Sequence, residues 1–306
     1  MSATEVVGAA IVAEFEVVSE AGTDMLLQAG SISKAIAALT ALTLVESGAL
    51  DLDGDVDERL VAGDGVTLRR LLSHTAAINV DSYPGYPPDV EPPTFRQSLA
   101  GAPPAATPPV VVDGTPGAGW RYSGGGYTIV QALIEDATGR PFADVARELV
   151  LAPLGMDAST FVQHPGTHVY PEAAAAGLWS TPGDLARFVI AVQDALAGRS
   201  SPLREETARL MVTGVVELPP LEELSQLRSL GLQPPDRMGL GLFVGGEGAA
   251  AHFSHVGGAA DSSSLLVGSL CDGSGAVVMA PGPFTPVLLA AAEIAAQRGW
   301  PGFGNS

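Results

Sequence analysis

Cysteine and lysine are almost missing from this 306-residue sequence, which contains one of each, Cys271 and Lys34. A single cysteine excludes a disulfide within the chain. Because Cys271 follows the apolar stretch 265–270, the sequence predicts a small buried side chain there and no cysteine nucleophile. The shortage of lysine is more informative, because the other fourteen of the fifteen basic residues are arginine.

Positive charge is scarce as a whole: the net charge is −19, which argues against nucleic acid and anionic membrane surfaces as partners. No stretch reaches the roughly 18 uncharged apolar residues of a membrane helix, and the N-terminus lacks the features of a secretory signal. We therefore expect a cytoplasmic protein with small-molecule partners. The oligomeric state is left open.

Patterns for metals and nucleotide cofactors are also absent. The five histidines are scattered without a His-Glu-x-x-His motif, and there is no phosphate loop or dinucleotide fingerprint. The run Asp51–Asp55 lacks the glycine position and the closing glutamate of a calcium loop, so it predicts an acidic turn. The sequence thus predicts no cofactor and no metal.

The single lysine is the first candidate for chemistry. Arginine can supply a fixed positive charge, but its guanidinium does not lose a proton at any accessible pH. Lys34 lies three residues after Ser31 at the start of an apolar helix, so the two side chains share one face. A helix N-terminus favours negative charge at the serine oxygen, and a lysine with a lowered pKa can accept the hydroxyl proton.

The periodicity of the chain predicts an α+β fold. The expected strands are 9–18, 24–28, 240–244, 252–256, 262–267 and 276–280. The expected helices are 32–46, 66–74, 128–138, 142–150, 181–196, 203–212, 219–229 and 286–297. Strands near both ends predict one antiparallel sheet built from both termini and flanked by helices. We expect a single catalytic domain, residues 1–306, with a sheet lobe (1–50 and 239–306) and an inserted, mainly helical lobe (51–238).

Residues 79–119 differ from the rest, with ten prolines and little periodicity. Their aromatic residues predict an ordered, irregular segment rather than a flexible linker. Because this segment leads into Tyr122, we expect it to form a wall of the active site, with Tyr83, Tyr86 or Trp120 available for substrate contact.

Two further motifs follow the nucleophile in order. In Tyr122-Ser123-Gly124, a tyrosine between a loop and a helix start can shuttle protons near Ser31. In His255-Val256-Gly257-Gly258, the strand glycines allow a ligand close to the backbone. The N–H groups of Ser31 and Gly258 can form an oxyanion hole.

These motifs resemble the serine β-lactamase and penicillin-binding-protein superfamily, in particular its class C-like esterase and transacylase branch. The segments Gln28–Lys34, Leu71–Ala76, Pro153–Met156 and Ala176–Leu185 are similar to family signatures, in order, over nearly the whole chain. The resemblance implies that Ser31 is the acylated nucleophile, Lys34 and Tyr122 the proton-transfer pair, and His255 the counterpart of the family's Lys/His-x-Gly residue. For His74 it implies a structural role.

Two departures from the family pattern shape the functional hypothesis. Many relatives have a substrate-contacting asparagine where this chain has Gly124, which favours esters, thioesters or compact amides over β-lactams and peptides. The segment before Ser31 is also short, so a sheet edge is left open or covered by a partner.

Three hypotheses remain. The leading one is an acyl-enzyme hydrolase of a small ester or amide. An acyl transferase to an amine or alcohol in small-molecule or natural-product biosynthesis is the alternative, and a non-catalytic acyl-binding sensor is the third. His255 is expected mainly to orient the acyl group or its carboxylate, and Gly124 and Gly257 are further candidates for substrate binding.

Overall fold

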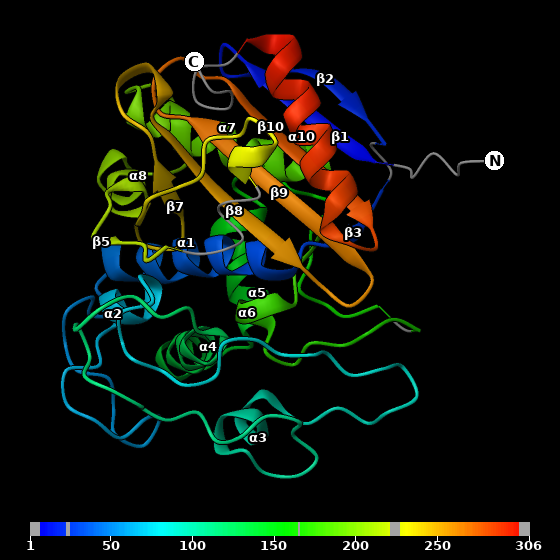
Figure 1. The fold of residues 1–306 in the computed structure, drawn as a ribbon. Helices are drawn as coiled ribbons and strands as arrows, with labels where there is room; N and C mark the ends of the chain where they lie inside the picture. Colours follow the sequence, from blue (N-terminus) through cyan, green and yellow to red (C-terminus); the bar gives the residue numbers. More distant parts are fainter. Residues whose placement is uncertain (1–6, 23–24, 165, 221–226, 300–306) are drawn as a thin grey trace.

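The computed structural model describes residues 7–22, 25–164, 166–220 and 227–299, and its main element is an eight-stranded antiparallel sheet (Figure 1). Its strand order is β2-β1-β10-β9-β8-β7-β6-β5, so the pairing of β1 with β10 joins the two ends of the chain. This confirms the antiparallel sheet built from both termini. The strands are β1 (Gly8–Ala13), β2 (Glu16–Ala21), β5 (Val216–Glu217), β6 (Arg237–Met238), β7 (Phe243–Gly245), β8 (His252–Gly258), β9 (Ser262–Ser269) and β10 (Gly275–Pro281).

Helices flank the sheet and pack on one another around α1 (Figure 1). They are α1 (Ser33–Glu46), α2 (Leu68–Leu72), α3 (Phe95–Ala100), α4 (Gly124–Thr138), α5 (Phe142–Ala146), α6 (Ala173–Ala176), α7 (Pro182–Leu196), α8 (Glu205–Val212) and α10 (Phe284–Arg298). Single turns are η1 (Gly30–Ile32), η2 (Arg147–Leu151) and η3 (Gly248–Ala250), and β3 (Leu27–Gln28) pairs with β4 (Trp179–Ser180). Helix α1 lies between the sheet and α4 to α6 (Figure 1).

Both faces of the sheet are covered because its central strands are apolar on both sides. In β10, Val277 and Met279 belong to the core that contains α1 and α7, whereas Val278 and Ala280 pack with α10. This alternation follows from the period of two along a strand. The sheet therefore forms a packed layer with helices on both faces, and the start of α1 lies against one of them.

The first strand differs from its prediction. Residues 9–18 form a hairpin, because Glu14 and Phe15 adopt positive φ (51° and 66°) and turn the chain between β1 and β2. Of the strand expected at 24–28, only Leu27–Gln28 is regular, and residue 24 lies outside the described residues. Two turn residues without glycine or proline gave no local signal for the hairpin.

Three further expectations are corrected or narrowed. The strand expected at 240–244 is displaced, because Gly239 N–H donates to the Leu242 carbonyl and forms the turn between β6 and β7. Most of the helix expected at 219–229 lies outside the described residues. The prediction of a buried Cys271 was wrong: the thiol is exposed and donates to the Gly248 carbonyl at 2.9 Å, because it lies in the β9–β10 turn.

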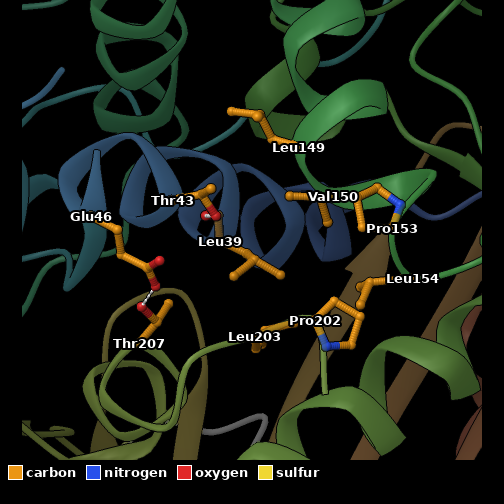
Figure 2. A pocket seen from close by; sticks show the side chains of 10 residues that line it. All are labelled: Leu39, Thr43, Glu46, Leu149, Val150, Pro153, Leu154, Pro202, Leu203 and Thr207. Atoms are coloured by element: carbon orange, nitrogen blue, oxygen red, sulfur yellow. Dashed lines mark hydrogen bonds between the residues drawn. The ribbon is translucent and has the colours of Figure 1, made fainter. Parts of the chain in front are cut away.

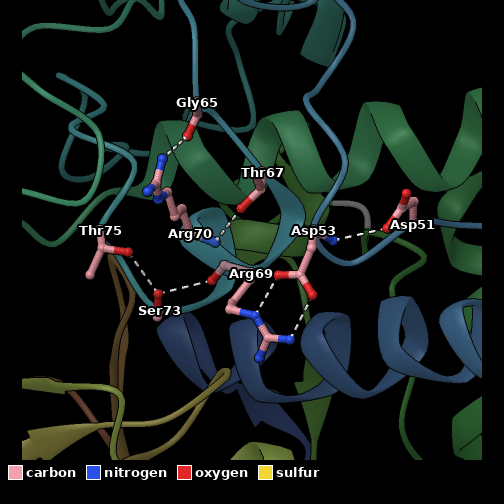
Figure 3. A network of polar contacts seen from close by, with 8 residues as sticks. All are labelled: Asp51, Asp53, Gly65, Thr67, Arg69, Arg70, Ser73 and Thr75. Atoms are coloured by element: carbon pink, nitrogen blue, oxygen red, sulfur yellow. Dashed lines mark hydrogen bonds and ion pairs between the residues drawn. The ribbon is translucent and has the colours of Figure 1, made fainter.

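The acidic turn stabilises α2 (Figure 3). Asp51 accepts the Asp53 N–H, and the Asp53 carboxylate pairs with Arg69 of α2 through two contacts of 2.6 and 2.9 Å. Thr67 caps the helix by accepting the Arg70 N–H. These contacts fix the segment that ends in His74.

A depression lies along the far half of α1, away from Ser31 (Figure 2). Its walls include Leu39 of α1, Val150 of η2 and Leu203, and the Thr207 hydroxyl donates to Glu46 at its edge. None of the predicted site residues lines it. Among the residues that the structure describes, no helix is both long enough and apolar enough to cross a bilayer.

Candidate active site

Ser31 and Lys34 lie together where η1 continues into α1. The Lys34 Nζ is 3.0 Å from the Ser31 Oγ and donates to the Ala175 carbonyl of α6 at 2.8 Å. Ser31 is half-buried, whereas Lys34 is only 2% exposed. The Ala175 carbonyl therefore holds the amine beside the serine through a hydrogen bond. A backbone carbonyl is not basic enough to remove the proton from the amine.

Burial lowers the pKa of Lys34, which is the change that a lysine needs in order to accept the serine proton. Desolvation lowers its pKa from 10.5 to about 7, and Asp81 opposes this shift. A shift of this size corresponds to about 5 kcal/mol against the charged form. At neutral pH a large fraction of the protein molecules therefore holds the free amine next to the serine hydroxyl.

Tyr122 lies over the same amine. The Lys34 Nζ is 4.9 Å from the centre of the Tyr122 ring, and the phenol lies beside the Ser31 hydroxyl. Burial raises the pKa of Tyr122 well above its usual value, and the neighbouring Ser31 only partly opposes this. The phenol therefore stays protonated at neutral pH and can give a proton to a leaving group.

His74 binds the two residues that flank Tyr122 in the sequence. Its carbonyl accepts the Arg121 N–H at 2.8 Å and its Nδ1 accepts the Ser123 N–H at 3.1 Å, while its ring lies 4.4 Å from that of Tyr122. His74 adopts a φ of +59°, rare for a residue with a side chain. His74 thus positions Tyr122 through both its ring and its backbone carbonyl. The resemblance implied a structural role for His74 but did not show that it acts on Tyr122.

Strand β8 brings the third motif against η1. A Cβ on Gly30 would lie 2.5 Å from the Gly258 carbonyl oxygen, and one on Gly257 would lie 1.9 Å from that of Ala29. Only glycine fits at these two contacts. His255 lies on the same face of β8 as Gly257 and is fully buried, with its ring 5.2 Å from that of Phe243.

The aromatic residues of the Pro-rich segment divide into two groups. Trp120 joins the site, with its ring 6.2 Å from those of both His74 and Tyr122. Tyr83 and Tyr86 anchor the segment: both rings are buried, the Tyr83 hydroxyl pairs with Thr128 at 2.8 Å and that of Tyr86 accepts the Ala106 N–H at 2.9 Å. Contact of these two with substrate stays a prediction.

Gly124 has a structural use in this chain. Its N–H donates to the Asp81 carbonyl at 2.7 Å, and a Cβ would lie 3.0 Å from that oxygen and 3.3 Å from the Tyr83 ring. A larger residue, such as the asparagine of many relatives, would have to displace this segment. The path of residues 81–83 therefore leaves too little room for an asparagine side chain at position 124.

The sequence matches the Beta-lactamase family over residues 3–298. The chain belongs to this family. It is 30% identical over 147 residues to penicillin-binding protein 4* of Bacillus subtilis, and the match covers 44% of this chain and 30% of that protein. It is 32% identical over 162 residues to esterase EstB of Burkholderia gladioli, with 45% and 39% covered.

Solved structures show the same fold over the whole family domain. A D-stereospecific amidohydrolase from a Streptomyces species matches with a TM-score of 0.73 and 24% identity, and 96% of this chain and 95% of that one are covered. By contrast, the matches to the two curated relatives span less than two fifths of their lengths.

Sequence motifs of the family gave no signal for the helix α6 contact. Ala175 contributes a backbone carbonyl, which no side-chain pattern marks, and the helix begins after Glu172, whose carboxyl is fully buried. Neither Glu172 oxygen makes a hydrogen bond of good geometry with a described residue. Burial raises the pKa of this carboxyl, and the nearby Ser98 hydroxyl partly opposes the shift.

Glu172 should therefore make stability fall with rising pH. Because its pKa is raised in the folded state, Glu172 holds its proton to a higher pH there than in the unfolded state, where the pKa is 4.5, so stability falls as the pH rises from 4.5 through the folded-state pKa. We expect the free energy of unfolding, measured by urea titration, to fall less between pH 4 and pH 7 in Glu172→Gln than in the wild type. Glu91→Gln, an exposed control, should leave the difference unchanged. A pH dependence identical in Glu172→Gln and the wild type would contradict the raised pKa of Glu172.

Proposed function

We propose that the protein is a serine acyl-enzyme hydrolase that acts on small esters or amides through acylated Ser31. The observation that carries this proposal is the buried Lys34 amine, 3.0 Å from the Ser31 oxygen and with a pKa of about 7. Such an amine is a general base matched to neutral pH.

In the first step, neutral Lys34 takes the Ser31 proton while the Oγ forms a bond to the substrate carbonyl carbon. Negative charge then develops on the carbonyl oxygen. The N–H groups of Ser31 and Gly258 are the proposed donors to that oxygen. The close approach of the Gly30 and Gly258 backbones supports this assignment, because it places the two segments side by side.

Collapse of this intermediate requires a proton for the leaving group. Tyr122 donates its phenolic proton to the leaving oxygen or nitrogen as the bond from carbon breaks, and the Lys34 ammonium returns a proton to the phenolate. Water then attacks acyl-Ser31 by the reverse route, which releases the acid and restores the serine. The raised pKa of Tyr122 supports the role of donor rather than resting base.

Relatives support the substrate class. EstB is named an esterase and the Streptomyces protein a D-stereospecific amidohydrolase. The glycine at position 124 supports compact substrates, since no side-chain amide is available there to pair with a peptide.

An acyl transferase shares the first half of this chemistry and differs only in the acceptor. The test is turnover of a phenyl ester with and without added primary amines or alcohols, and quantification of free acid against acylated acceptor. A hydrolase yields mainly acid at all acceptor concentrations, whereas dominant transfer product would favour the transferase. Stable acylation without turnover would indicate a sensor.

The pH dependence of acylation follows from the buried amine. Because only neutral Lys34 can accept the proton, kcat/KM should rise with pH and level off above a midpoint of about 7. Asp81→Asn should move the midpoint to lower pH, since Asp81 raises the pKa of Lys34. A profile that is flat between pH 5 and 9 would exclude Lys34 as the base.

A further inference from the structure

Strand β9 begins with three buried serines, Ser262, Ser263 and Ser264, each at most 3% exposed. Burying a hydroxyl costs free energy unless it is hydrogen-bonded, so each of these side chains needs a partner. Because side chains alternate along a strand, Ser262 and Ser264 point to one face of the sheet and Ser263 to the other. The partners on the two faces therefore show what each serine does.

Ser262 and Ser264 bind the segment that leads into the nucleophile. The Ser262 hydroxyl donates to the Gln28 carbonyl at 2.7 Å, and the Ser264 hydroxyl donates to the Ala29 carbonyl at 2.9 Å. These two carbonyls belong to the residues just before Gly30 and Ser31 in the sequence. Two side chains of an interior strand thus fix the backbone path that ends at the Ser31 N–H.

Ser264 also contacts the strand that carries the second proposed donor. It is the partner of Gly257 in the pairing of β8 with β9, and its hydroxyl lies 3.3 Å from the Gly257 carbonyl oxygen. A Cβ at Gly257 would collide with both the Ser264 hydroxyl and the Ala29 carbonyl oxygen. One buried hydroxyl therefore lies between the segment that leads to Ser31 and the residue that precedes Gly258.

We infer that Ser262 and Ser264 are positioning residues that set the separation of the Ser31 and Gly258 N–H groups, the two proposed oxyanion donors. This inference rests on the proposed function and assigns the two serines to one part of it. Such donors stabilise the developing charge only from about 2.7–3.1 Å, so a small displacement of either segment weakens them. Both hydroxyls bind backbone carbonyls, and they therefore act through the backbone and not on the substrate.

Ser263 provides a matched control in the same strand. Its hydroxyl is equally buried and donates to the Gly282 carbonyl at 2.6 Å, on the opposite face of the sheet. Its backbone pairs with Gly258, and Ser263→Ala leaves that pairing in place. Each of the three serine-to-alanine variants thus loses a buried hydroxyl, so a general loss of stability should be similar in all of them. A loss of oxyanion stabilisation should be confined to Ser262→Ala and Ser264→Ala.

A phenyl ester and the thionoester of the same acid, which has sulfur in place of the carbonyl oxygen, isolate this part of the site. Sulfur is a larger atom and a weaker hydrogen-bond acceptor, so donors placed for oxygen stabilise it less. Each kcat/KM is divided by the rate of the same compound in buffer. We expect the ratio of ester to thionoester to fall roughly fivefold or more in Ser264→Ala, as for the loss of one hydrogen bond, and mainly through kcat for the ester. The ratio should fall less in Ser262→Ala and keep its wild-type value in Ser263→Ala.

A wild-type ratio in Ser264→Ala would overturn the inference, as would an equal fall in Ser263→Ala, while the esterase activity stands. Thermal unfolding shows which variants fold; if Ser264→Ala does not fold, a wild-type ratio in Ser262→Ala overturns the inference instead. Turnover of no ester above the Ser31→Ala background would overturn the proposed function, and this inference with it.

Discussion

Ser31→Ala should reduce ester turnover to the rate of the buffer control, a loss of about 10⁴-fold or more, because no other group can form the acyl-enzyme. Labelling by a fluorophosphonate probe should disappear in parallel. The fold should persist, since Ser31 is only half-buried and its hydroxyl contacts the side chains of Lys34 and Tyr122.

The matched control is Ser33→Ala, two residues along the same motif. Ser33 is buried, donates to the Gly30 carbonyl at 2.5 Å and accepts the Leu178 N–H at 2.9 Å, so its loss should lower stability and preserve labelling. Labelling retained in Ser31→Ala and lost in Ser33→Ala would show that the nucleophile is the other serine.

Lys34→Arg should be as damaging as Lys34→Ala, about 10² to 10⁴-fold in kcat/KM, although it keeps the positive charge. The guanidinium cannot lose a proton, and the site that lowers the pKa of the amine to about 7 disfavours a fixed charge. Thermal unfolding of both variants shows whether each of them folds. If Lys34→Arg does not fold, a folded but inactive Lys34→Ala still shows that the amine is required for activity. Recovery of most of the wild-type rate by arginine would mean that Lys34 acts only as a fixed charge.

The sequence predicted the parts of the site that depend on side chains at fixed local spacing. Ser31 and Lys34 are one helical turn apart, so the spacing places both side chains on one face, and their contact at 3.0 Å agrees with it. The sheet made from both termini was also predictable, because the sequence shows strand patterns near both ends of the chain with helices between them, and β9 and most of β10 are indeed buried on both faces.

What the sequence could not supply are contacts made by backbone groups and by tertiary packing. The Ala175 carbonyl that anchors Lys34 is 141 residues away, and any residue could provide it. The two N–H groups that His74 binds around Tyr122 depend on a left-handed residue at position 74, which no local pattern of glycine or asparagine signals. Tyr83 and Tyr86 illustrate the converse, since only the packing of the segment shows that they anchor it.

The most direct test of the central claim is rapid acid quenching of wild-type protein during turnover of a phenyl ester, followed by mass spectrometry of its peptides. We expect the acyl mass on the peptide that contains Ser31, formed as fast as the first equivalent of phenol and then hydrolysed. Phenol release at the full rate with no acyl mass on Ser31, while the adduct of a control serine hydrolase survives the same quench, would contradict the acyl-enzyme.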